Sequence, residues 1–183
     1  MPILDHLEPQ AVFSYFEQLC AIPHGSGNTK EISDHLVLFA AEHHLRCIQD
    51  AHNNIVIFSP GTPGYESAAP VILQGHMDMV CEKNSDVEFD FDRDPIRTRI
   101  DGGWVRAEGT TLGADCGIGM AAALAVLIDP SVEHGPVEAL FTVDEETGLT
   151  GAFELGEDML TGKYLVNLDS EDEGEIFIGC AGG

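Results

Sequence analysis

The chain has 183 residues and carries 32 Asp and Glu against 8 Lys and Arg, which gives a formal net charge of −24 at pH 7. A chain this acidic is repelled by phosphate and lacks the basic clusters that bind anionic lipid, so we expect neither nucleic acid nor a membrane surface as a partner. Its hydrophobic content of 44% is ordinary for a globular protein, and its length is typical of a single domain.

The cysteines and the N-terminal segment indicate a cytoplasmic protein. The five cysteines include no C-x-x-C pair, which argues against a disulfide framework or a cysteine zinc finger. The first residues include acids where a secretory signal peptide would have basic residues. The longest apolar run, 120–128, is much shorter than the roughly 18 residues that a membrane span requires. We therefore expect a soluble protein in a reducing compartment.

Apolar spacing and turn residues predict that strands and helices alternate along the chain. The predicted elements, in order, are helices over 9–22 and 28–44, strands over 45–50, 54–59 and 71–74, a hairpin of 96–100 and 104–107, a helix over 118–128, a strand over 137–143, a helix over 149–160, and strands over 164–168 and 175–180. Asn28 and Glu31 are spaced as a capping box for the second helix. The alternation predicts a layered α/β domain.

A glycine pattern at residues 117–122 imitates a dinucleotide-binding turn. It follows a loop that ends in Asp115 instead of a strand, and an anion bound there would meet that carboxylate. We therefore predict that Gly117 and Gly119 serve the packing of the helix.

Histidine and carboxylate side chains gather where the predicted strands end. Five of them stand at such positions: His76 and Asp78 after the strand over 71–74, Glu145 and Glu146 after 137–143, and Asp169 after 164–168. A sixth, Asp115, stands where a loop enters the helix over 118–128. Each motif alone is more often a structural hydrogen bond, a helix cap or a solvated loop than part of a metal site, and only their occurrence together favours a site. Ligands bind at the carboxyl ends of strands in open α/β sheets, and imidazole with carboxylates suits Zn²⁺, Mn²⁺ or Co²⁺ in a hydrolytic site.

Several long motifs carry a family resemblance. They are PHGSGNTKEISDHL (23–36), GHMDMV (75–80), GTTLGADCGIGMA (109–121), DEETGLTGA (144–152), NLDSEDEGEI (167–176) and GCAGG (179–183). The chain resembles the di-zinc peptidases related to aminoacylase and glutamate carboxypeptidase, and within them the bacterial cytosol non-specific, or aminoacyl-histidine, dipeptidases. The resemblance spans essentially the whole chain. It implies a layered α/β/α catalytic domain with a mixed sheet, here incomplete at its C-terminus.

The resemblance implies two zinc ions and names their ligands. His76 and Asp169 would bind the first ion, Glu146 the second, and Asp115 would bridge both. Co²⁺ or Mn²⁺ could take the place of zinc.

The resemblance also implies roles for two further acids, one that orients a metal ligand and one that takes a proton from water. Asp78 would accept the second N–H of His76, which fixes the tautomer of the ring and strengthens it as a donor. Glu145 would be the general base that takes a proton from the metal-activated water and delivers it to the leaving amine.

The chain departs from the family pattern in two ways. Cys116 stands where relatives often have Asn, directly after the bridging acid. The second zinc also lacks its distal histidine, because the remaining histidines match no ligand motif, and none of the eight basic residues adjoins one. We therefore expect residues 1–183 to be the N-terminal portion of a longer enzyme, without its lid domain and the remainder of its catalytic domain.

The expected activity of the full-length protein is zinc-dependent hydrolysis of Xaa-His and other unblocked dipeptides, and the resemblance also allows a homodimer. One alternative is an aminoacylase or deacylase that acts on N-acyl amino acids, since the first half of its site would look the same. Another is a catalytically incomplete module. For residues 1–183 alone we expect weak, substoichiometric zinc binding and no peptidase activity.

Overall fold

The computed structural model describes residues 2–170 and 174–179 of the chain. Its elements, in order, are α1 (Gln10–Cys20), α2 (Lys30–Glu42), β1 (Arg46–Gln49), β2 (Ile55–Ser59), β3 (Val71–His76), β4 (Thr98–Asp101), β5 (Trp104–Ala107), α3 (Ala114–Ile128), β6 (Val137–Thr142), α4 (Thr150–Phe153) and β7 (Tyr164–Asn167). Strands and helices alternate, so the predicted α/β class is confirmed. The predicted hairpin is also present, as the separate two-stranded sheet of β4 and β5.

Five strands form one mixed sheet in the order β1-β2-β6-β3-β7. β1 pairs with β2, and β2 with β6, in antiparallel fashion, whereas β3 runs parallel to both of its neighbours, β6 and β7. The carboxyl ends of these three parallel strands therefore lie at the same edge of the sheet. All the predicted site residues except Asp115 follow or end one of these strands.

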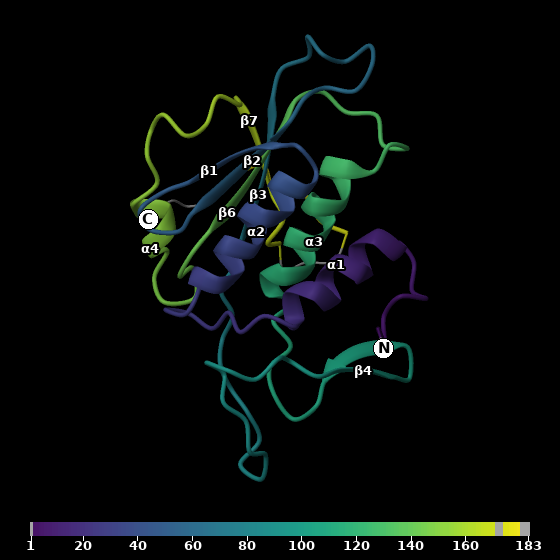
Figure 1. Ribbon diagram of the computed structural model, residues 1–183, viewed down its shortest axis with the longest axis vertical. Helices are drawn as coiled ribbons and strands as arrows, with labels where there is room; N and C mark the ends of the chain where they lie inside the picture. The colour runs from purple at the N-terminus through teal and green to yellow at the C-terminus, as the bar shows by residue number, and fades with distance from the viewer. Residues whose placement is uncertain (1, 171–173, 180–183) are drawn as a thin grey trace.

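Helices α1, α2 and α3 cover one face of the sheet (Figure 1). α3 packs against α1 and β3, and α2 packs against β1 and β2. The larger apolar cluster lies between the helices and the sheet and includes Phe16, Leu36, Met120 and Phe141. Full burial of each such side chain contributes about 1.5–3 kcal/mol. Gly117 has the predicted packing role, because a Cβ there would lie 3.2 Å from the Phe16 ring.

The opposite face of the sheet contacts the irregular segment that follows α4. A smaller apolar cluster joins Met159 to the sheet residues Val56, Ile72 and Leu140. The helix predicted over 149–160 is wrong for most of its length, because α4 ends at Phe153. Gly156, which costs about 1 kcal/mol relative to Ala inside a helix, follows soon after. The apolar residues after α4 therefore reach the sheet from turns instead of from a helix face.

The strand predicted over 175–180 is not formed where the structure describes it. Residues 175–179 belong to no strand, and Ile176 and Ile178 are almost fully exposed. A strand needs a partner for its backbone groups, and within the described residues this segment has none. Residues 171–173 and 180–183, which include Cys180 and parts of two family motifs, lie outside the described residues.

The start of α2 also differs from its prediction. Thr29 is the N-cap residue and no side chain caps the helix, so the predicted capping box is wrong. The backbone N–H of Asn28 instead donates to the carbonyl of Gly25 at 2.8 Å, which makes Asn28 part of the preceding turn. Among the described residues, no helix combines the length and the apolar character needed to cross a membrane.

Candidate metal centre

The candidate site lies where β3 and β6 end side by side. His76 is the last residue of β3 and is in register with Thr142, the last residue of β6. Asp78 is the second residue after β3, and the turn after β6 carries Glu145 and Glu146. Because the two strands are parallel and end together, the segments that leave them meet at this edge.

A glycine in β3 brings the start of α3 to the same edge. A Cβ on Gly75 would lie 2.9 Å from Sγ of Cys116, so a larger residue would push α3 away from the strand. Asp115 and Cys116 have non-helical backbone angles, and the regular turns of α3 begin after them. This arrangement places the Asp115 carboxylate next to His76, with Asp115 Oδ1 2.9 Å from His76 Nε2.

A second glycine brings the segment after β7 alongside α3. A Cβ on Gly119 would lie 3.0 Å from Cβ of Leu168, which is tighter than an ordinary contact, so Gly119 has the predicted packing role. The backbone N–H of Leu168 also donates to the carbonyl of Gln74 at 2.8 Å. Together these contacts hold Asp169, the next residue, at the site.

His76 is buried at the centre of the site. Its Nδ1 atom lies 2.9 Å from the backbone oxygen of Asp78 and 3.3 Å from Oδ1 of the same residue, so Nδ1 carries a proton. Its Nε2 atom faces three carboxylates, those of Asp115 at 2.9 Å, Asp169 at 3.7 Å and Glu145 at 3.9 Å. Burial lowers the pKa of His76, but hydrogen bonds to Asp78 and Asp115 and the nearby negative charges raise it to about 9.

The Asp78 carboxylate is buried and has four donors around it. Oδ1 accepts from the backbone N–H of Glu145 at 2.9 Å and faces His76 Nδ1, whereas Oδ2 accepts from the Ser26 hydroxyl at 2.7 Å and the N–H of Glu146 at 3.3 Å. Burial alone would raise the pKa of Asp78, but the hydrogen bonds from His76, Ser26 and Glu145 lower it below its ordinary value. Asp78 therefore remains ionised.

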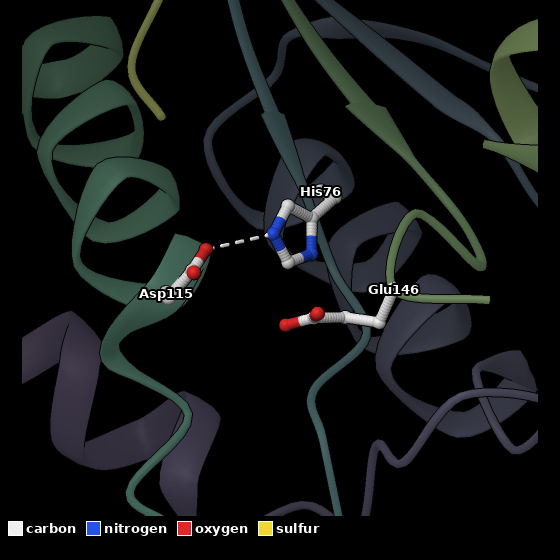
Figure 2. A group of neighbouring side chains, drawn as sticks. All are labelled: His76, Asp115 and Glu146. Carbon is white, nitrogen blue, oxygen red and sulfur yellow. Dashed lines mark hydrogen bonds and ion pairs between the residues drawn. The ribbon is translucent and has the colours of Figure 1, made fainter. Parts of the chain in front are cut away.

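Two groups of side chains could each hold a metal ion. Their donor atoms lie within 4.8 Å of one another in the sets His76, Asp115 and Glu146, and His76, Glu145 and Asp169. Figure 2 shows the first set converging from the end of β3, the start of α3 and the turn after β6. In the part of the chain that the structure describes, His76 is the only histidine in such a group.

The charges of these carboxylates fit a divalent cation. Burial, together with the hydrogen bond and the charge of Asp115, raises the pKa of Asp169 to about 6. Burial and the charge of Asp115 also raise the pKa of Glu146. Crowded carboxylates repel one another, and a dication removes this repulsion. Imidazole with carboxylate oxygens is also a ligand set that zinc and related ions use in hydrolytic enzymes.

The structure thus brings all six predicted site residues together, while Cys116 takes no part in either group. The Cys116 thiol is buried, and burial raises its pKa to about 12, so it remains neutral. The ion pairs of Lys30, Arg93, Arg99 and Arg106 within the described residues all involve acids away from this site.

Two side chains at this edge were missed by sequence reasoning, Ser26 and Asp144. The Ser26 hydroxyl reaches Asp78 across 52 residues of sequence, and the backbone N–H of Gly27 donates to Oδ1 of Asp144 at 2.7 Å across 117 residues. Both contacts tie the loop between α1 and α2 to the site. Ser26 lies within one of the family motifs, but no spacing rule marks a single hydroxyl as the partner of a distant carboxylate.

The chain is similar to known peptidases. It is 50% identical over all 183 residues to the cytosol non-specific dipeptidase of Escherichia coli K12, of which it covers 38%. Its structure matches aminoacylhistidine dipeptidase from Vibrio alginolyticus with a TM-score of 0.94 and 47% identity, covering 97% of this chain and 36% of that one. A tripeptidase from Staphylococcus aureus, with a TM-score of 0.75, 24% identity and coverage of 91% and 44%, shares the fold.

The family comparison gives the same result, since residues 72–180 match the peptidase family M20/M25/M40. The resemblance predicted from the motifs is therefore confirmed. The chain spans less than half the length of the two dipeptidases that it matches.

Proposed function

The chain belongs to peptidase family M20/M25/M40, and on this basis we propose that the protein carrying it is a metallodipeptidase of the cytosol. The observation that carries the proposal is the arrangement of one imidazole among carboxylates in two overlapping groups at the carboxyl edge of the sheet. Two relatives are named as a non-specific dipeptidase and an aminoacylhistidine dipeptidase, which favours unblocked dipeptides, including Xaa-His, as substrates.

We propose that the site holds two Zn²⁺ ions. His76 and Asp169 would bind one ion, Glu146 the other, and Asp115 would bridge them. The position of His76 Nε2, within 3.7 Å of both Asp115 and Asp169, supports the first part of this assignment. The closeness of Glu146 to Asp115 in the first ligand group supports the second. When bound, such ions polarise the scissile carbonyl and lower the pKa of a water molecule.

The general base in this proposal is Glu145. Of the three carboxylates that face His76 Nε2, that of Glu145 is the most distant, at 3.9 Å, and it is partly exposed. A carboxylate in this position can take a proton from water and give it to the departing amine, which typically accelerates hydrolysis by about 10²- to 10⁴-fold.

Asp78 prepares His76 and the turn after β6 for these roles. Its contacts with Nδ1 keep a proton on that atom, so Nε2 is the ring nitrogen that would lose its proton and bind a metal ion. Its bonds to the N–H groups of Glu145 and Glu146 hold both side chains at the same edge.

We also propose that residues 1–183 are the N-terminal portion of the catalytic domain, and that a further metal ligand and the group that binds the substrate carboxylate lie elsewhere in the protein. The short coverage of both dipeptidases supports this proposal. So does the edge strand β7, whose residues Tyr164, Leu165 and Val166 are between 46% and 64% exposed. We therefore expect residues 1–183 alone to bind zinc weakly and to be inactive.

The test is an assay of the full-length protein before metal removal, after it, and after Zn²⁺ is restored. The substrates are an Xaa-His dipeptide, a dipeptide without histidine and an N-acetyl amino acid. We expect hydrolysis of both dipeptides, loss of activity on metal removal and recovery with Zn²⁺. Preference for the N-acetyl amino acid would indicate a deacylase instead, and activity that survives complete metal removal would contradict the proposed chemistry.

A further inference from the structure

The loop between α1 and α2 contacts the carboxylate that orients His76. Ser26 is half-buried in this loop, and its hydroxyl donates to Oδ2 of Asp78 at 2.7 Å. This is the shortest contact that the Asp78 side chain makes. The next candidate acceptor for the hydroxyl, the carbonyl of Met79, lies at 3.5 Å, so Asp78 is the partner of Ser26.

The two oxygens of Asp78 each face one backbone N–H and one side-chain donor. Oδ1 has the N–H of Glu145 and the ring of His76, and Oδ2 has the N–H of Glu146 and the hydroxyl of Ser26. Without the hydroxyl, Oδ2 keeps only the N–H of Glu146 at 3.3 Å. A buried carboxylate with one poorly satisfied oxygen loses free energy and gains by rotating toward other donors.

The Ser26 loop itself is held in place by backbone groups. The N–H of Met79 donates to the carbonyl of His24 at 3.2 Å, and the N–H of Ser26 donates to the carbonyl of Met79 at 3.3 Å. The N–H of Gly27 donates to Asp144 at 2.7 Å. None of these bonds uses the Ser26 hydroxyl, so its removal leaves the path of the loop unchanged.

We infer that Ser26 is a positioning residue of the metal centre, whose hydroxyl fixes the rotation of the Asp78 carboxylate. Through Asp78 it sets the orientation of His76 and of the turn that carries Glu145 and Glu146. Ser26 thus acts on both the metal ligands and the general base without touching either. This inference rests on the proposed function, because it assigns Ser26 a role only if the site binds metal.

The test compares Ser26→Ala, Ser26→Thr and Ser33→Ala with the wild type in the full-length protein. Ser33, in α2, is a matched control, because its buried hydroxyl donates to the carbonyl of Asn53 at 2.8 Å and to no site residue. The measurements are the Zn²⁺ dissociation constant of the metal-free protein by competition with a chelator, kcat and KM for a dipeptide, and the Tm without metal.

We expect Ser26→Ala to weaken Zn²⁺ binding and to lower kcat, each by about 10- to 100-fold, with KM little changed. Ser26→Thr, which keeps the hydroxyl, should restore both values. Ser33→Ala should leave both unchanged, with a Tm no higher than that of Ser26→Ala. Three results would overturn this inference and leave the proposed function standing. They are wild-type zinc affinity and kcat in Ser26→Ala, no rescue by Ser26→Thr, and an equal loss in Ser33→Ala. A wild-type protein that binds no zinc would overturn the proposed function and this inference together.

Discussion

Two buried carboxylates at opposite ends of the sheet bind neighbouring segments in the same way. Glu138, the second residue of β6, accepts hydrogen bonds from the backbone N–H groups of Thr161 and Gly162 and from the Thr161 hydroxyl. Asp78, just beyond β3, likewise accepts from two consecutive N–H groups and one hydroxyl. In both places the donors stabilise a buried charge, and the charge fixes the segment that carries them.

The two anchored segments differ in what they carry. Thr161 and Gly162 add no imidazole or carboxylate to the surroundings of Glu138. The turn bound by Asp78 carries two carboxylates, and the Asp78 side chain also faces His76. A buried acid with satisfied hydrogen bonds is therefore a general structural device, and only its titratable neighbours make the Asp78 end a candidate reaction centre.

The largest effect is expected at the turn that Asp78 holds. Glu145→Gln in the full-length protein should lower kcat by about 10²- to 10⁴-fold, because an amide cannot accept the proton of water. Bound metal should be retained, since the proposed ligands are unchanged. The measurement is kcat together with metal content, and Glu157→Gln, at an exposed acid that belongs to neither group of converging side chains, is the control. Wild-type turnover in Glu145→Gln would exclude Glu145 as the base.

Replacing the two buried acids separates their roles. Asp78→Ala should weaken Zn²⁺ binding by about 10- to 100-fold, because His76 loses the acceptor that orients it. Glu138→Ala should leave zinc binding unchanged and lower the free energy of unfolding by about 1–3 kcal/mol for each donor left unpaired. Chelator competition and denaturant unfolding measure the two quantities. If Glu138→Ala weakens zinc binding as much as Asp78→Ala does, the contrast between the two ends is wrong.

The stability of the metal-free protein should also depend on pH through His76, which Asp78 contacts. The pKa of His76 in the folded, metal-free protein is about 9, above its ordinary value of 6.5, so the protonated ring favours the folded state. This stabilisation is complete below pH 6.5 and is lost as the pH rises to about 9, by roughly 3 kcal/mol at most. Denaturant unfolding of metal-free protein between these pH values measures it. The decline should be absent in His76→Gln, and an equal decline in that variant would assign it to another group.

The smallest effect is expected at Cys116. Its buried, neutral thiol packs against Gly75 and belongs to neither ligand group. Cys116→Ala should therefore leave zinc affinity unchanged and cost about 1 kcal/mol of stability through lost packing. Chelator competition and thermal unfolding test both expectations. A clear loss of zinc affinity would mean that the thiol contributes to the site.

Elements were predicted correctly from the sequence where the spacing of apolar residues matches both their burial and the backbone conformation. The apolar run of β3 and the helical spacing in α1 gave elements close to those observed. The segment after α4 was misassigned because its apolar residues, Leu155, Met159 and Leu160, recur at helical spacing yet pack on the sheet from turns. Spacing reports which residues are buried, and here it did not report the backbone conformation that buries them.

The candidate site was predictable to the extent that its residues follow strands or match family motifs. Strand ends and motifs located His76, Asp115 and the other ligand candidates, because parallel strands bring their ends together. The Ser26 contact with Asp78 depends on how a loop folds back across 52 residues. No local pattern encodes that distance, so the positioning of Asp78 required the structure.

The number of zinc ions bound per full-length chain tests the metal centre most directly. Equilibrium dialysis of the metal-free protein against Zn²⁺, with metal content measured by elemental analysis, should give two ions in the wild type. Binding of the first ion should be greatly weakened in His76→Ala, because His76 is one of its proposed ligands and lies in both groups of converging side chains. A wild-type protein that binds fewer than two ions, or a His76→Ala variant that binds them as tightly as the wild type, would contradict the account.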